Sequence, residues 1–248
     1  MPSPLISIIT VCYNAEKTIE RTIQSVLAQT YLKIEYIIID GKSTDGTMRI
    51  VDKYRDRISV VISEPDQGYY DALNKGIRAA KGEWIHQINA DDYYSNTESL
   101  QGALLCADPD KLNYYKMRLV EVDGLEGDFY REYSHWRMWY SSSIPHPAML
   151  LSKKQYAKIG EYNTGYEIAG DVEFIFRALK FYEPLPHSGS FVTMVQGGMS
   201  AANNIVGFKE FRRSSIEHGL HPFLAWGFYY IKRVRSLVFG LHRKYHQK

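Results

Sequence analysis

The sequence predicts an α/β protein with a mostly parallel sheet flanked by helices and with a helical C-terminal tail. In the first 90 residues, short apolar runs alternate with stretches in which apolar residues recur every three or four positions. The runs are typical of strands buried on both faces, and the stretches are typical of amphipathic helices that cover them. Strands and helices that alternate in this way form parallel sheets.

The first half alternates strictly between the two kinds of element. We expect strands at residues 5–11, 36–39, 58–62 and 84–88, and helices at residues 14–27, 47–55 and 70–81. Asn14 is the candidate cap of the first helix, and Gly82 stops the third. Polar clusters follow the four strands at residues 10–13, 40, 63–66 and 89–92. Ligands bind at the carboxyl ends of parallel strands, so these clusters predict one binding site.

The second half is less regular. We expect strands at residues 114–122, 148–151 and 191–195, helices at residues 170–181, 205–217 and 222–246, and a turn at residues 124–127. The chain is therefore divided into residues 1–95, residues 96–203 of the same domain, and a helical basic tail of residues 204–248.

Composition indicates a folded globular protein, with 45% hydrophobic and 23% charged residues. The net charge of +2 hides a basic tail, because nine Lys and Arg residues but two acids follow residue 207. No apolar run reaches the roughly 18 residues of a membrane span. No basic segment or cleavage site precedes the first strand, which indicates a cytoplasmic protein. Cys12 lies in an apolar run and is expected to be a buried free thiol.

Four ordered segments carry a resemblance to a known family. They are IITVCYN at residues 8–14, IIIDGKSTDGT at 37–47, SEPDQGYYDALNKG at 63–76 and INADD at 88–92. Together they resemble the opening of the family-2 glycosyltransferases, which have the GT-A fold of the nucleotide-diphospho-sugar transferase superfamily. The processive signature Gln-x-x-Arg-Trp is absent, which indicates transfer of a single sugar.

The resemblance implies a function for each part of the chain. Residues 1–95 would bind a UDP-sugar, and residues 96–203 would bind the acceptor and carry the catalytic base. The reaction would be inverting transfer to a hydroxyl of a lipid-linked glycan in cell-surface polysaccharide biosynthesis. No nucleic-acid partner is expected. Two other classes stay open, namely an enzyme that makes sugar nucleotides and a non-catalytic binding module for sugar nucleotides or glycans.

The acidic cluster of residues 89–92 resembles the metal-binding motif of the family. A diphosphate leaving group carries concentrated charge, which a hard cation held by carboxylates neutralises. Asp91 would therefore hold Mn²⁺ or Mg²⁺, with Asp92 as a second ligand or as the residue that orients Asp91. Relatives often have Asp where Asn89 stands, so Asn89 would contact the donor without charge. A strand-end turn with helix-capping acids is the alternative interpretation.

The donor base has its own candidates. Asp40 resembles the family acid that accepts a hydrogen bond from a uracil N–H, and Thr10 and Tyr13 would supply backbone groups and an aromatic edge. The alternative for Asp40 is a turn-forming Asx residue before Gly41. Relatives often have Arg where Leu73 stands, which leaves a phosphate contact from that helix in doubt, with Lys75 as a candidate replacement.

Asp171 is the candidate general base. The segment GDVEFIFR at residues 170–177 resembles the acidic-helix motif of the family, and its Asp would remove the acceptor proton from the face opposite the leaving group. Relatives often have Glu where Gly170 stands. The alternative is a helix-capping role for Asp171, with Glu173 adding favourable charge.

Three further residues have two interpretations each. His146 would bind pyrophosphate or join the metal site, or it is a rigid loop residue between two prolines. Trp136 and Trp139 would stack on acceptor sugars, or they pack in the core.

The tail combines aromatic residues at 223–230 with Lys232, Arg233 and Arg235. This composition suits a helix that lies on the anionic inner face of the cell membrane. The alternatives are a helix packed on the catalytic domain and a dimer contact.

Overall fold

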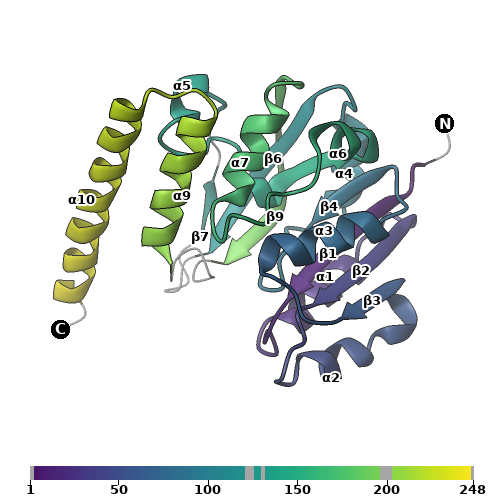
Figure 1. Ribbon diagram of the computed structural model, residues 1–248. Coiled ribbons are helices and arrows are strands. Elements are labelled where there is room, and N and C mark those ends of the chain that lie inside the picture. The colour runs from purple at the N-terminus through teal and green to yellow at the C-terminus, as the bar shows by residue number, and fades with distance from the viewer. Residues whose placement is uncertain (1–2, 121–125, 130–131, 196–202, 247–248) are drawn as a thin grey trace.

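A computed structural model describes residues 3–120, 126–129, 132–195 and 203–246. The strands form one curled sheet of nine strands in the order β3-β2-β1-β4-β8-β6-β9-β5, with β7 paired to β6. Helices lie on both sides of the sheet, and the C-terminal helices lie at the end of the molecule farthest from β3 (Figure 1). The α/β prediction and the helical tail are therefore confirmed.

The first half is the predicted alternation of strands and helices. Its elements are β1 (Ile6–Cys12), α1 (Ile19–Leu27), β2 (Ile34–Asp40), α2 (Thr47–Asp52), a 3-10 turn (Arg55–Arg57), β3 (Val60–Ser63), α3 (Tyr69–Ala79) and β4 (Trp84–Gln87). All pairs among these four strands are parallel. Successive β1 residues point to opposite faces of the sheet. Ile9 packs with Leu73 of α3 in one hydrophobic core, and Ile8 packs with Ile23 of α1 in the other.

The second half extends the sheet with strands of both directions. Its elements are β5 (Tyr93–Tyr94), α4 (Ser99–Cys106), β6 (Leu112–Val120), β7 (Glu126–Phe129), α5 (His135–Met138), a 3-10 turn (His146–Ala148), β8 (Met149–Ser152), α6 (Lys153–Ile159), α7 (Gly170–Ala178) and β9 (Pro184–Val195). β8 joins the two halves, since it pairs antiparallel with both β4 and β6. Residues 121–125, which include part of the predicted turn at 124–127, lie outside the described residues.

Asn14 does not cap the first helix, so this prediction was wrong. α1 begins only at Ile19, after Thr18, and Asn14 has a left-handed backbone with φ of 50°. Its side-chain oxygen accepts a hydrogen bond from the Thr44 amide at 2.9 Å, and its own amide donates to the Ser43 hydroxyl at 2.8 Å. Asn14 thus joins the loop after β1 to the loop after β2. Its left-handed backbone is accommodated because Asn tolerates this region better than most residues.

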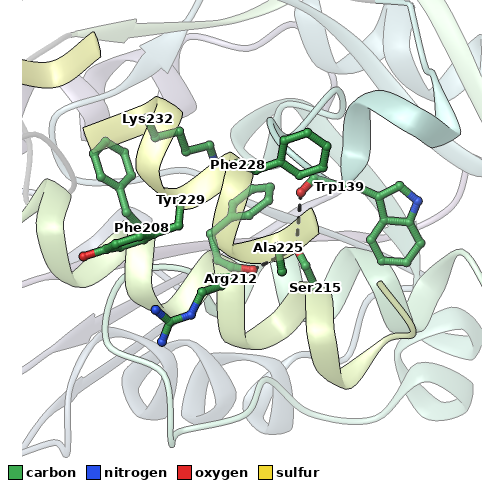
Figure 2. A pocket seen from close by; sticks show the side chains of 9 residues that line it. Trp139, Phe208, Arg212, Ser215, Ala225, Phe228, Tyr229 and Lys232 are labelled. Carbon is green, nitrogen blue, oxygen red and sulfur yellow. Dashed lines mark hydrogen bonds between the residues drawn. The ribbon is translucent and has the colours of Figure 1, made fainter. Parts of the chain in front are cut away.

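The tail forms a helical pair that packs on the second half of the chain. α9 (Asn204–Glu217) contacts α7, and α10 (Pro222–His246) lies alongside α9 (Figure 1). Figure 2 shows the contact between them, where Phe228 and Lys232 of α10 face side chains from α9 and Trp139. No helix in the described parts of the chain is long and apolar enough to cross a membrane.

Candidate active site

The four parallel strands of the first half bring their polar ends to one edge of the sheet. Cys12 at the end of β1 is in register with Asp40 at the end of β2, and Asp40 is in register with Ser63 at the end of β3. β4 ends at Gln87 beside β1, and the acidic cluster follows directly. The register of the sheet therefore brings the four polar clusters to one edge, as predicted.

Helix α1 holds the backbone of the acidic turn at residues 89–92. The Thr22 hydroxyl donates to the Asp92 carbonyl oxygen at 2.6 Å, and the Arg21 guanidinium donates to the Asp91 carbonyl oxygen at 2.8 Å. Asn89 joins the turn internally, since its side-chain amide donates to the Asp92 carboxylate at 2.9 Å. The turn is thereby fixed by bonds to its main chain, and the carboxylate of Asp91 is left for other partners.

The two carboxylates of the turn differ in their surroundings. Asp92 is 1% exposed, and its other oxygen accepts from the Val195 amide at 3.3 Å. Burial raises the pKa of Asp92 to about 8, and the neighbouring charge of Asp91 adds to the rise. Burial also raises the pKa of Asp91, but no side-chain hydrogen bond reaches its carboxylate from the described residues. Asp91 is therefore the open member of the pair, and Asp92 is the member held in place.

This donor set fits a hard divalent cation. The nearby Arg21 does not offset the burial that raises the pKa of both carboxyl groups, so a divalent cation would favour their ionised forms, and carboxylate oxygens are the ligands such a cation prefers. Within the described ranges, no group of three or more His, Cys, Asp or Glu side chains is arranged to hold a metal. Asp91, with Asp92 behind it, would hold the ion, and diphosphate oxygens and water would complete its shell.

The candidate nucleobase residues do not all reach the surface. Thr10 is fully buried, and its hydroxyl lies 3.1 Å from the hydroxyl of Tyr36. Asp40 is also fully buried, and it accepts from the Ser43 hydroxyl at 2.5 Å and from the Ser63 hydroxyl at 2.6 Å. These bonds, with those from the Ser43 amide, favour the turn-forming alternative, and the nucleobase contact of Asp40 stays a prediction. Of the candidates, Tyr13 presents an exposed ring at this edge, with 64% of its surface accessible.

Asp66, which the sequence analysis did not single out as a binding residue, also lies at this edge of the sheet. A Cβ added to Gly41 would overlap the Asp66 carboxylate and would lie 3.4 Å from the Tyr13 ring. The absence of a side chain at residue 41 therefore makes room for the Asp66 carboxylate beside Tyr13. Asp66 is partly exposed, and its other oxygen accepts from the Gly68 amide at 2.9 Å. The sequence signal was its place in the polar cluster of residues 63–66, which follows the third strand.

Two adjacent tyrosines at the start of α3 connect the acidic turn to the candidate base. The Tyr69 hydroxyl donates to the Asn89 side-chain oxygen at 2.7 Å. The Tyr70 hydroxyl donates to the Ile168 carbonyl at 2.9 Å and accepts from the Asp171 amide at 3.1 Å. Burial raises the pKa of Tyr69, and the charges of Asp171, Asp92 and Asp91 raise it further. Tyr69 is therefore near enough to all three carboxylates for their charges to act on its hydroxyl.

Asp171 lies in the first turn of α7, as predicted, but it does not cap the helix. The capping position is Ala169, which makes no side-chain capping bond, while the Asp171 carboxylate accepts from the next amide, that of Val172, at 2.8 Å. Burial raises the pKa of Asp171 to about 6. A carboxylate with this pKa is ionised at neutral pH and is a stronger base than an ordinary Asp.

Gly170 explains how Tyr70 comes so close to Asp171. A Cβ at residue 170 would lie 2.7 to 2.9 Å from atoms of the Tyr70 ring, nearer than side chains approach. The packing of this ring therefore requires glycine at residue 170. The residue before the candidate base therefore packs against an aromatic ring and carries no acidic side chain.

The remaining candidates have mainly structural surroundings. His146 is buried, with the Gln87 amide 2.6 Å from its Nδ1 and the Tyr162 hydroxyl 2.7 Å from its Nε2. Burial lowers the pKa of His146 to about 3. These bonds favour its interpretation as a structural loop residue. Lys75 forms ion pairs with Glu64 at 3.0 Å and Asp71 at 3.5 Å, so its charge is already matched within the described residues.

The two tryptophans separate. Trp139 stacks on Phe176 with ring centroids 4.9 Å apart and lines the contact between α9 and α10 (Figure 2). This position favours packing as its role. Trp136 remains 57% exposed, so the proposal that it stacks on an acceptor sugar stays open.

Known proteins similar to this chain agree on its family. The model for glycosyl transferase family 2 matches residues 7–161. An uncharacterised glycosyltransferase of Mycobacterium tuberculosis is 32% identical over 190 residues, which are 74% of this chain and 72% of the relative. A PGL/p-HBAD biosynthesis glycosyltransferase of the same species is 27% identical over 183 residues, which are 71% and 70% of the two chains.

Two solved structures share the fold. Residues 1–349 of S. aureus TarS in complex with UDP-GlcNAc superpose with a TM-score of 0.69 at 20% identity, covering 89% of this chain and 69% of that one. The chain spans 41% of a longer TarS structure. A mannosyltransferase of Pyrobaculum calidifontis in complex with GDP-Man and Mn²⁺ gives a TM-score of 0.63 at 17% identity, covering 95% and 75%. The GT-A fold is thereby confirmed, and the chain belongs to glycosyltransferase family 2 and is a glycosyltransferase.

Proposed function

We propose that the chain transfers one sugar from a UDP-sugar to a hydroxyl of a lipid-linked glycan, with inversion at the anomeric carbon. The observation that carries this proposal is the position of Tyr69 and Tyr70. Their hydroxyls bind Asn89 of the acidic turn and the amide of Asp171, respectively. Two adjacent residues of α3 thus contact the acidic turn and the start of α7, which supports a leaving-group site and a base within one active site.

The proton and the electrons can be followed through the step. Asp171 takes the proton of the acceptor hydroxyl while that oxygen forms a bond to the anomeric carbon of the donor. The bond from this carbon to the diphosphate oxygen breaks, and its electron pair leaves with UDP. One displacement from the face opposite the leaving group inverts the anomeric centre. A divalent cation at Asp91 and Asp92 would supply the positive charge that the departing diphosphate needs.

Relatives support the choice of donor and acceptor. A S. aureus TarS fragment forms a complex with UDP-GlcNAc. A glucosyltransferase of Escherichia coli, named for UDP-Glc and GlcNAc-diphosphoundecaprenol, is 41% identical over 95 residues, 38% of each chain. We therefore infer uridine as the donor base and a polyprenyl-diphosphate-linked glycan as the acceptor class.

The test is release of UDP from UDP-sugars in the presence of Mn²⁺, first without and then with a polyprenyl-diphosphate-linked sugar. We expect slow hydrolysis alone and a large increase in rate with the acceptor. The anomeric configuration of the product, measured by NMR, checks inversion. Retention of configuration, or no acceptor-dependent release from any UDP-sugar, would contradict the proposal. Release from GDP-sugars alone would contradict the uridine assignment.

We further propose that the outer face of α10 rests on an anionic membrane. The helix has two faces, and the inner one packs on α9, with the Lys232 ammonium 3.4 Å from the Phe211 ring centroid. Four of its exposed apolar side chains, Phe223, Tyr230, Val234 and Leu237, form a stripe at helical spacing, and Leu224, Trp226 and Ile231 are exposed as well. Arg235 beside the stripe is exposed. Apolar side chains flanked by Arg suit the headgroup region of an anionic membrane and would bring the enzyme to a lipid-linked acceptor at its cytoplasmic face.

Vesicle co-sedimentation tests the membrane proposal. The wild-type protein should bind vesicles that contain about 30% phosphatidylglycerol more strongly than neutral vesicles, because the anionic lipid attracts the basic side chains. The double variant Val234→Ser/Leu237→Ser should lose most of this binding, while Leu105→Ser, an exposed apolar residue on α4, should not. Equal binding of wild type and the double variant would contradict the proposal, and a concentration-dependent dimer that the double variant abolishes would assign the stripe to a second copy of the chain.

A further inference from the structure

The segment that leads into α7 is held by one carboxylate from the C-terminal part of the chain. Glu210 of α9 accepts from the amide of Glu167 at 2.7 Å through one oxygen. Its other oxygen accepts from the amides of Ile168 and Ala169, each at 2.8 Å. Three consecutive N–H groups therefore converge on a single side chain. Hydrogen bonds to an ionised acceptor are stronger than those between neutral groups, so this anchor is firm.

The same segment is held from its other side by Tyr70. The Tyr70 hydroxyl donates to the carbonyl of Ile168 at 2.9 Å, so both polar groups of residue 168 have partners. It also accepts from the amide of Asp171 at 3.1 Å. Between the two anchors lies Gly170, where the packed Tyr70 ring leaves no room for a side chain. The backbone just before the candidate base is thus clamped between α3 and α9.

We propose that Glu210 is a positioning residue for Asp171, which fixes the start of α7 and contributes a negative charge to the surroundings of the base. The inference rests on the proposed role of Asp171 as the general base. It adds to that role a dependence on α9, which lies beyond residues 7–161 matched by the family model. The C-terminal helices are then part of the catalytic apparatus and not an appendage.

The electrostatics agree with this geometry. Burial is the main cause that raises the pKa of Asp171 to about 6, and the charge of Glu210 raises it further. Hydrogen bonds from the Asp171 and Val172 amides and from Tyr70 act in the opposite direction. The other titratable or charged groups of these elements are Tyr69, Tyr70, Asp71, Lys75 and Arg78 of α3, Glu167 of the loop, Glu173 and Arg177 of α7, and Lys209, Arg212, Arg213 and Glu217 of α9.

Several of these groups are already paired with one another. Glu173 binds Arg177 at 2.8 Å, and Arg213 binds Glu217 at 2.7 Å. Tyr69 and Tyr70 are neutral at ordinary pH, because burial raises the pKa of each well above its usual range. Among these groups, Glu210 is the acid whose charge raises the pKa of Asp171. Removal of its charge should therefore lower the pKa of the base.

The experiment compares Glu210→Gln and Glu210→Ala with the matched variant Glu217→Gln. Glu217 is a carboxylate on the same helix, two turns away, and its bonds go to Tyr166 and Arg213 instead of the clamped backbone. For each protein we would measure kcat/KM against pH with a UDP-sugar and a polyprenyl-diphosphate-linked acceptor. Thermal unfolding would report the folded fraction, and donor KM would be measured separately.

The variants should separate charge from position. Glu210→Gln removes the charge, so the acid limb of its pH profile should move to lower pH. It keeps one acceptor oxygen for two of the three amides, so kcat should also fall by a few-fold. Glu210→Ala should lose roughly 10- to 100-fold in kcat, since a misplacement of about 1 Å has that effect, with donor KM unchanged. Glu217→Gln should match the wild type in both measurements.

Two results would overturn the inference. An acid limb of Glu210→Gln that stays in place with kcat within about twofold of wild type would show that Glu210 does not act on the base. A loss of activity that follows only the loss of folded protein, with no movement of the limb, would show a merely structural role. Asp171→Asn distinguishes the levels of the argument, because an active Asp171→Asn refutes the proposed function, whereas an inactive one beside an unaffected Glu210→Gln refutes this inference alone.

Discussion

The acidic turn and the candidate base are held in different ways. The backbone of residues 89–92 is fixed by Thr22 and Arg21 of α1, and Asn89 joins the turn to Asp92. All of these residues belong to the first 95, although β9 adds one amide, that of Val195. Asp171 depends on Tyr70, 101 residues earlier, and on Glu210 of the C-terminal tail.

This difference separates what each region requires. The donor edge is a local product of strand ends and short loops, so it should tolerate changes elsewhere in the chain. The base exists in its position only when α3, α7 and α9 are packed together. Substitutions in the two regions should therefore have separable effects on donor binding and on turnover, and the predictions below test this separation.

Asp171→Asn should give the largest effect, a loss of roughly 100- to 10,000-fold in kcat, which is the range for loss of a general base. Donor binding in the presence of Mn²⁺ should change little, because the acidic turn and the nucleobase residues are untouched. Steady-state kinetics and calorimetric titration with UDP would measure the two quantities. Glu167→Gln, an exposed carboxylate four residues earlier, is the matched control and should behave as wild type. Near-normal turnover of Asp171→Asn would remove the base assignment.

Asp91→Asn should affect the opposite quantity. The amide keeps the shape of the side chain but removes one charge from the cation site, so Mn²⁺-dependent UDP affinity should fall by roughly 10- to 100-fold. UDP titrations with and without Mn²⁺ would show the change, with Asp110→Asn as an exposed control on the loop before β6. If the variant kept the full Mn²⁺ dependence of the wild type, the ion would have other ligands.

Gly41→Ala should weaken nucleotide binding by about tenfold, equivalent to about 1.4 kcal/mol, without loss of folding. The new methyl group would displace the Asp66 carboxylate, which is the end of a flexible side chain and can move. Asp66→Ala should have a similar effect, and combining the two should add little because they act on the same group. Gly102→Ala, where a Cβ meets only open space, serves as the control. Additive losses in the double variant would show that Asp66 does not act through the space above Gly41.

The sequence predicts most of the donor edge because its signals are local. Apolar runs identify β1 and β2, and the acids that follow a strand must lie at its carboxyl end. A local signal was also overlooked at α6, where Ser152 and Gln155 form a capping box. The prediction that Asn14 caps the first helix was wrong because its amide oxygen accepts from Thr44, in a loop 30 residues away.

The surroundings of the base could not be read in this way. Nothing near Glu210 indicates that its carboxylate binds amides at residues 167–169, since that contact arises from packing of α9 against α7. Gly170 likewise looked like the loss of an acidic neighbour, whereas the ring of Tyr70 determines it. Sequence patterns identify Asp171 by resemblance, but its pKa and its anchors follow from tertiary contacts.

The smallest expected effect concerns stability, and it tests whether burial of the ionised Asp171 carboxylate lowers the free energy of unfolding. The pKa of Asp171 is about 6 in the folded protein against an ordinary 3.8, so the folded state binds the proton more tightly than the unfolded state does. Stability from this group is therefore present at low pH and is lost as pH rises through about 6. Asp171→Asn has no such loss, so at pH 8 it should melt a few degrees above wild type, about 2–4 °C for each kcal/mol, whereas at about pH 4 the two should melt together. Circular dichroism at the two pH values measures the difference, with Glu167→Gln as control. Equal melting temperatures at both pH values would mean that the base is as well solvated as an ordinary surface Asp, and the contrast with the acidic turn would then rest on geometry alone.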